Sequence, residues 1–144
     1  MGRAIIKAEE YQLIGKESGR GVSIELSPYD MPREVEGRFD KEEGVLHIDF
    51  KYLDQEEALL KKIGDSLKMK VGKHSGKILG FEVSVTEHNI KKVELMTVQQ
   101  MDEAIDNAIP DLPRFNQRAN YKVVKSILDQ KRGPIFASLA TAGA

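Results

Sequence analysis

The sequence predicts an α+β fold, in which an antiparallel β meander of five or six strands carries two or three helices packed on one face. Residues 45–50 alternate apolar and polar side chains, which is the period of a half-buried strand. Residues 67–71 repeat this pattern, and residues 78–85 follow them after a glycine-containing turn. Apolar stripes at helical spacing appear later, in residues 101–109 and 124–128. The two longer helices are therefore expected after the strands.

The N-terminal part is expected to form a hairpin. Residues 4–14 fit either a strand or a two-turn helix, and the alternatives stay open on periodicity alone. The three glycines of residues 15–21 and the clean alternation of residues 22–26 favour a strand. Residues 27–32 are expected to be a loop, because their two prolines hold the preceding residues extended. Residues 35–40 are predicted to form a short strand that turns into the strand at 45–50.

A short helix is expected between the two halves of the meander. Asp54 and Glu57 have the spacing of a capping box, which marks the start of a helix. The apolar residues that follow lie on one side of such a helix, and Gly64 suits its end. These apolar residues are Leu59, Leu60 and Ile63.

Two longer helices are predicted in the C-terminal third. A second capping box begins at Thr97, and Pro110 is expected to end the helix that follows. The last helix is expected to start near Pro113 or Asn120 and to end at Gly133, which precedes another proline.

Length and composition indicate one globular domain over residues 1–144, with flexible last residues. The chain has no cysteine, which excludes disulfides, thiolate metal sites and a cysteine nucleophile, and which fits a cytoplasmic location. No stretch approaches the roughly 20 apolar residues of a membrane helix, so no membrane association is expected. No cofactor motif is complete. Residues 72–77 resemble a phosphate-binding loop but have the wrong spacing and join two predicted strands.

Residues 40–85 carry a pattern of the form Asp…Leu-x-Ile-x-Phe…Gly-x-Ile-x-Gly-x-Glu. This pattern resembles that of short uncharacterised bacterial β domains, a family of unknown function. Two departures are a histidine at position 47, where the family often has tyrosine, and the segment inserted between the two halves. The resemblance implies a β meander and no particular chemistry.

His47, Asp49 and Glu82 form the candidate polar or metal-binding face. His47 and Asp49 are two residues apart on one strand, so their side chains point to the same side. Glu82 joins them if its strand pairs alongside in the right register. The same three residues would be the site of an enzyme, but no nucleophile elbow or converging pair of carboxylates accompanies them. A solvated outer sheet face is the favoured interpretation.

The C-terminal segment holds a candidate binding surface. From residue 114 onward there are six basic residues and one acidic residue, whereas acidic residues dominate the rest of the chain. Basic and aromatic side chains alternate in this segment, as in proteins that contact phosphates and stack on bases. The surface consists of Arg114, Arg118, Tyr121, Lys122 and Lys125. Helical spacing also allows Tyr121 to belong to the core instead.

The sequence favours a non-enzymatic binding or assembly module that associates with itself as a homo-oligomer or with another protein. The first alternative is a nucleic-acid-binding protein that uses the basic C-terminal helix. The isoelectric point of about 6.3 disfavours it, because dedicated nucleic-acid domains are strongly basic. The second alternative is an enzyme with its site around His47, Asp49 and Glu82.

Overall fold

The structure is a computed structural model that describes residues 3–7, 31–85 and 90–143. These residues form six strands, two long helices and one short 3-10 helix. The strands are β1 (Arg3–Lys7), β2 (Glu34–Asp40), β3 (Val45–Lys51), β4 (Ala58–Gly64), β5 (Leu67–Gly72) and β6 (Ile78–Ser84), and the helices are α2 (Ile90–Ala108), η3 (Ile109–Asp111) and α3 (Phe115–Gly143).

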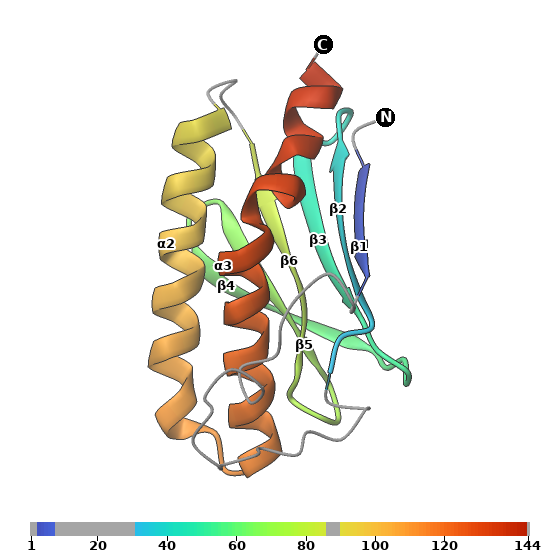
Figure 1. The fold of residues 1–144 in the computed structure, drawn as a ribbon. Helices are drawn as coiled ribbons and strands as arrows, with labels where there is room; N and C mark the ends of the chain where they lie inside the picture. Colours follow the sequence, from blue (N-terminus) through green and yellow to red (C-terminus); the bar gives the residue numbers. More distant parts are fainter. Residues whose placement is uncertain (1–2, 8–30, 86–89, 144) are drawn as a thin grey trace.

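The six strands form one antiparallel sheet in the order β1-β2-β3-β6-β5-β4. The first three strands and the last three are each a meander, and the pairing of β3 with β6 joins the two meanders in the middle of the sheet. Helices α2 and α3 lie side by side on one face of this sheet (Figure 1). The predicted α+β fold is therefore confirmed.

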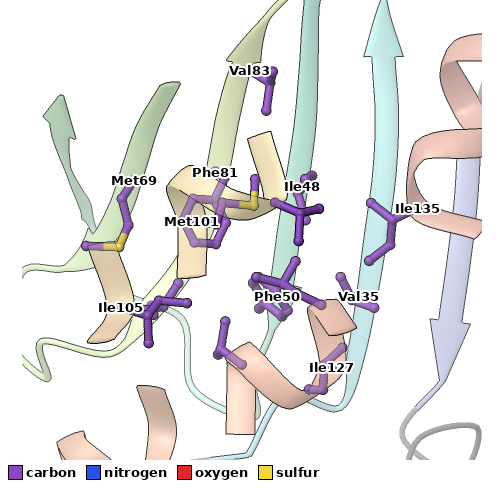
Figure 2. Close-up of a cluster of buried hydrophobic side chains, with 14 of the residues drawn as sticks. Val35, Ile48, Phe50, Met69, Phe81, Val83, Met101, Ile105, Ile127 and Ile135 are labelled. Atoms are coloured by element: carbon purple, nitrogen blue, oxygen red, sulfur yellow. The ribbon is translucent and has the colours of Figure 1, made fainter. Parts of the chain in front are cut away.

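An apolar core lies between the sheet and the two helices (Figure 2). The alternation in β3 places every second side chain in this core, as the sequence predicts. Phe81 on β6 is fully buried, and its ring meets the Phe50 ring edge-on, with the centroids 6.4 Å apart. Met101 of α2 and Ile127 of α3 close the core from the other side. The helical stripes predicted from the sequence thus supply the second layer of the core.

A buried polar cluster ties the start of α3 to the sheet. The side-chain oxygen of Asn120 accepts a hydrogen bond from the backbone N–H of Ile78, at 3.0 Å. Its amide nitrogen donates to the hydroxyl of Tyr52, and that hydroxyl donates to the carbonyl of Ile78. Asn120 is completely buried, so these bonds supply the partners that its polar atoms need.

Residues 54–64 do not form the predicted helix, because residues 58–64 are strand β4, which pairs with β5. The capping box is therefore misread. Glu56, within that box, instead caps the turn between β5 and β6, where its carboxylate accepts the N–H groups of His74 and Ser75 at 2.8 and 3.0 Å. Seven residues hardly support an isolated helix, whereas pairing with β5 satisfies the backbone along most of their length.

The predicted start of the second helix at Thr97 is wrong. α2 begins at Ile90, and Thr97 is buried within it. The apolar stripe continues back through Val93, which packs against the core, so the helix gains contacts well before the capping box. The predicted end is confirmed, because α2 stops at Ala108 and Pro110 lies in the 3-10 helix that follows.

The last helix also runs further than the sequence predicts. α3 continues past Gly133 to Gly143, with a kink at Lys131, where φ is −120° and ψ is 17°. Pro134 explains the kink, since its ring has no N–H and crowds the preceding turn.

Burial beyond the kink explains why the helix continues. Ile135 and Phe136 are almost fully buried against the sheet. Gly37 on β2 makes this close approach feasible, because a Cβ atom there would lie 2.7 Å from the carbonyl oxygen of Ile135. Tertiary packing therefore outweighs the local stop signal at Gly133.

At the N-terminus, β1 confirms a strand for residues 3–7. The remainder of the predicted N-terminal hairpin lies outside the described residues, namely residues 8–14, the loop at 15–21, the strand at 22–26 and most of the loop at 27–32.

Candidate functional site: the outer face and the free edge of the sheet

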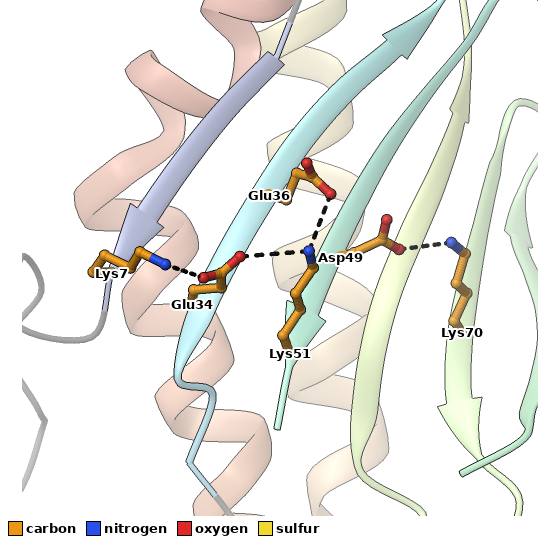
Figure 3. A network of polar contacts seen from close by, with 6 residues as sticks. All are labelled: Lys7, Glu34, Glu36, Asp49, Lys51 and Lys70. Atoms are coloured by element: carbon orange, nitrogen blue, oxygen red, sulfur yellow. Dashed lines mark hydrogen bonds and ion pairs between the residues drawn. The ribbon is translucent and has the colours of Figure 1, made fainter. Parts of the chain in front are cut away.

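The face of the sheet opposite the helices carries a band of charged side chains (Figure 3). Lys7 on β1 forms an ion pair with Glu34 on β2. Lys51 on β3 lies 3.4 Å from the carboxylates of both Glu34 and Glu36. The hydrogen bond from Lys7 is the main reason that the pKa of Glu34 lies below its usual value. These four residues neutralise one another across three strands.

The band continues from β3 to β5. The Lys70 ammonium donates to the Asp49 carboxylate at 2.8 Å and reaches it across the intervening strand β6 (Figure 3). Gly80 stands on β6 opposite both residues, so no side chain blocks the contact. A Cβ atom at position 80 would lie 3.1 Å from the Asp49 carboxylate and only 2.3 Å from the carbonyl oxygen of Ile48.

The structure places the predicted polar face on this open side of the sheet. His47 lies directly opposite Glu82 in the pairing of β3 with β6, which is the register that the sequence argument required. Asp49 lies on the same face but is held by Lys70. These three residues therefore line a half-exposed surface on which Asp49 is already held in an ion pair.

A different group around His47 has the spacing of metal ligands. Candidate ligand atoms of Asp40, Glu43 and His47 lie within 4.8 Å of one another at the turn between β2 and β3. Two carboxylates and one imidazole form a set of ligands that can bind zinc or manganese. The sequence argument missed Asp40 and Glu43, because only the folded turn brings them to the histidine. Their spacing across a predicted turn was the available signal.

Zinc or nickel is nevertheless expected to leave the melting temperature unchanged. One oxygen of Asp40 already accepts the N–H groups of Glu42 and Glu43, at 3.0 and 3.2 Å, and Arg38 stands opposite His47 on β2. A metal that binds only the native state would raise its stability in proportion to occupancy. A rise in melting temperature that grows with zinc and disappears in His47→Ala would contradict this expectation.

The five residues of the predicted basic surface do not form one exposed patch, because some are buried or already bound to other groups. Tyr121 is buried in the core, and burial raises the pKa of its hydroxyl. Lys125 donates to both carboxylate oxygens of Asp106 on α2, each at 2.8 Å. Arg118 donates to the carbonyl of Leu112 at 2.7 Å. Arg114 and Lys122 remain exposed, and the Phe115 ring in the same segment is 60% exposed.

Asp102 lies between α2 and α3 in a less favourable setting. Its Oδ1 atom is buried and has no hydrogen-bond partner among the described residues. Burial raises the pKa of this carboxyl above its ordinary value of 3.8, and the nearby charge of Asp129 adds to the effect.

Asp102→Asn is therefore expected to raise the unfolding free energy at neutral pH by about 1 kcal/mol. In the unfolded chain this carboxyl ionises near its ordinary pKa, whereas the folded protein resists ionisation until a higher pH. The wild type therefore loses unfolding free energy as the pH rises from the unfolded pKa of Asp102 to its higher folded pKa. The extra stability of the Asp102→Asn variant should disappear below about pH 4, where the carboxyl is protonated in both states. Denaturant unfolding at several pH values measures this, and an advantage that persists at low pH would refute the explanation.

Strand β4 forms one edge of the sheet, and within the described part of the chain it pairs only with β5. Leu59 is 50% exposed and Leu60 is 55% exposed, on opposite faces of this strand. Exposed leucines on an edge strand are unusual, because such an edge invites pairing with another chain. Lys61 and Lys62 follow them and are also exposed.

A cavity of about 200 Å³ lies between the first half of α2 and the sheet. Ser66, Ser84, Lys92 and Met96 are among the residues that line it. Pockets that enclose small-molecule ligands are usually about 300–1,000 Å³. This cavity is smaller than that range and contains none of the predicted site residues.

Comparisons with protein-family models, with curated proteins and with solved structures return no match for this chain. The resemblance of residues 40–85 to short bacterial β domains stays a prediction. In the described ranges, neither helix has a stretch that is long and apolar enough to cross a membrane.

Proposed function

We propose that this protein is a non-enzymatic assembly module, which binds a partner by adding a strand of that partner to the free edge of β4. The observation that carries the proposal is the exposure of Leu59 and Leu60 on this edge strand. Self-association into a homo-oligomer is one form of such assembly. The cysteine-free composition remains the reason to expect a cytoplasmic location.

The backbone of β4 offers half of its hydrogen-bonding groups to a partner. The N–H of Lys73 donates to the carbonyl of Glu57 at 2.9 Å, which extends the ladder with β5 by one residue. In an antiparallel ladder alternate residues bond to the same neighbour, so residues 57, 59 and 61 bond to β5. Ala58, Leu60 and Lys62 then direct their N–H and C=O groups to the free edge. Added strands bind through such groups, and side chains on both faces give specificity.

The other edge of the sheet is less suited to this role. Among the described strands β1 lies at the opposite edge, and α3 packs against it. Ile6 is buried in the core and Lys7 is held by Glu34, although Ile5 is 43% exposed. By contrast, α2 meets β4 near Gly64, where the Gln100 side chain approaches the strand, and leaves the leucines uncovered.

The two alternative functions have less support. For nucleic-acid binding, the burial of Tyr121 and the contacts of Lys125 and Arg118 leave two residues of the predicted surface, Arg114 and Lys122, without a side-chain partner among the described residues. For an enzyme, the predicted site residues lie on an open sheet face.

Hydrogen exchange at the free edge tests the proposal. The probe is an uncharged peptide of the length of β4, made of alternating valine and threonine. We expect it to slow exchange of the Leu60 and Lys62 amides, which face the free edge, and to leave the Lys61 amide unchanged, since that amide bonds to β5.

The control is a peptide of equal length with proline at alternate positions, which cannot complete the ladder. It should have no effect on either set of amides. Unchanged exchange of the Leu60 and Lys62 amides with the valine–threonine peptide at the highest soluble concentration would overturn the proposed function.

A further inference from the structure

We infer that the strand added to β4 is β4 of a second copy, paired antiparallel about a two-fold axis at Leu59. This inference rests on the proposed function and names its partner. It follows from the order of charges around the strand, because residues 56–62 read Glu-Glu-Ala-Leu-Leu-Lys-Lys.

The segment is complementary to itself in the antiparallel direction. With the axis at Leu59, the two Leu59 side chains face each other and Ala58 lies opposite Leu60 of the second copy. Glu57 then lies opposite Lys61, and Glu56 opposite Lys62, each of them twice by symmetry. Directly opposite pairs of unlike charge stabilise antiparallel strands, whereas like charges destabilise them. If the axis lay at Leu60 instead, Lys61 would lie opposite Leu59, and the pair of Lys61 with Glu57 would be lost.

The geometry of β4 permits this register. An axis perpendicular to the sheet keeps the helix-covered faces of both copies on the same side, so each residue must meet one from the same face. Leu59 shares its face with Val71 in the buried layer, and Leu60 shares its face with Lys70 on the outer side. With the axis at Leu59, odd-numbered residues of one copy lie opposite odd-numbered residues of the other, and even-numbered opposite even-numbered, so each residue meets one from the same face. The even-numbered residues direct their N–H and C=O groups to the free edge and would form the hydrogen bonds between the copies.

The charged groups are available for new pairs. In the parts of the chain that the structure describes, Lys61 and Lys62 form no ion pair, and both are exposed. The Glu57 carboxylate is 78% exposed and lies 3.2 Å from the exposed ammonium of Lys73. Surface pairs of this kind are weak, so Glu57 can exchange that partner. Glu56 keeps one oxygen on the turn amides, so the pair of Glu57 with Lys61 carries most of the specificity.

Helix α2 leaves room for the second copy. It contacts β4 at Gly64, where a Cβ atom would lie 3.1 Å from the Gln100 side chain. Gly64 is five residues from Leu59, or about 16 Å along a strand. The two α2 helices therefore approach the joint from opposite ends. A strand pair of this length buries less than the ~1,200 Å² typical of stable complexes, so we expect a weak, concentration-dependent dimer.

Charge reversal tests the register directly. In sedimentation equilibrium, Glu57→Lys and Lys61→Glu should each weaken the dimer by about tenfold, because each places two like-charged pairs at the joint. An equimolar mixture of these two variants should restore association as a heterodimer. The lysine introduced at position 57 of one copy then faces the glutamate introduced at position 61 of the other, and at the second pair native Lys61 faces native Glu57. Lys122→Glu is the control, because it makes the same change of charge on an exposed side chain of α3, away from β4, and it should leave association unchanged.

Circular dichroism on each variant confirms that the fold is retained. Single variants that associate as the wild type does, or a mixture that fails to restore the dimer, would overturn the inference. A wild type that stays monomeric, while the valine–threonine peptide still slows exchange at Leu60 and Lys62, would overturn the second copy as partner and leave the proposed function standing. Failure of both experiments would overturn both.

Discussion

Phe81→Ala is expected to lower the unfolding free energy by about 3–5 kcal/mol. The side chain is fully buried where β6 meets the helices, and its ring packs edge-on against Phe50. Removing it takes away apolar contact area and leaves a cavity that a sheet held by two helices cannot easily close. Denaturant unfolding of the purified variant measures the loss.

His74→Ala is the matched control, because His74 is exposed in the turn between β5 and β6. Its backbone N–H donates to Glu56, and alanine retains that donor, so the change should stay within about 0.5 kcal/mol. Equal losses in the two variants would contradict the placement of Phe81 in the core.

Gly80→Ala is expected to destabilise the protein by about 3 kcal/mol or more, although it adds one methyl group. That methyl would lie 2.3 Å from the carbonyl oxygen of Ile48, which belongs to the backbone of the central strand and cannot turn away. It would also press on Asp49 and so disturb the ion pair with Lys70. Thermal and denaturant unfolding measure the effect.

Gly133→Ala separates this steric effect from the general effect of replacing glycine. Gly133 lies in α3, and a Cβ atom there would have no neighbour within 4 Å. Alanine at such a helical position should stabilise by up to about 1 kcal/mol. A Gly80→Ala variant that is as stable as the wild type would show that β3 and β6 are further apart than the structure has them.

The central strands could be predicted because their buried faces repeat with a period of two. Residues 45–50, 67–71 and 81–85 each place apolar side chains on one side, and the structure turns that side to the helices. The alternation is interrupted at the start of β6, where Ile78 is buried and the pairing with β5 shifts in register near Val71. Strand β4 could not be predicted in this way. Its leucines are adjacent and exposed, so no face is consistently apolar, and the acidic residues before it imitate the start of a helix.

The site was predictable only in part, for a related reason. Alternation along each strand predicts that His47 and Asp49 share one face, whereas the pairing of His47 with Glu82 depends on β3 and β6 being neighbours in this register. The approach of Asp40 and Glu43 to His47 depends on the path of a turn, and the contact of Lys125 with Asp106 depends on how two helices are set against each other. Neither contact produces a repeating pattern of residues from which it could be predicted. The helical stripe did allow Tyr121 to be read as a core residue, and it is buried.

The position of β1 at the far edge of the sheet decides whether association through β4 would stop or propagate. Two copies joined at β4 would present β1 at both ends of the doubled sheet. β1 contains basic residues at its two ends, Arg3 and Lys7, and no acidic residue. Antiparallel pairing of β1 with itself in full overlap would bring these like charges together, which disfavours the contact. For a sheet that ends in β1, as the described strands do, this repulsion favours a closed pair over an open-ended fibre.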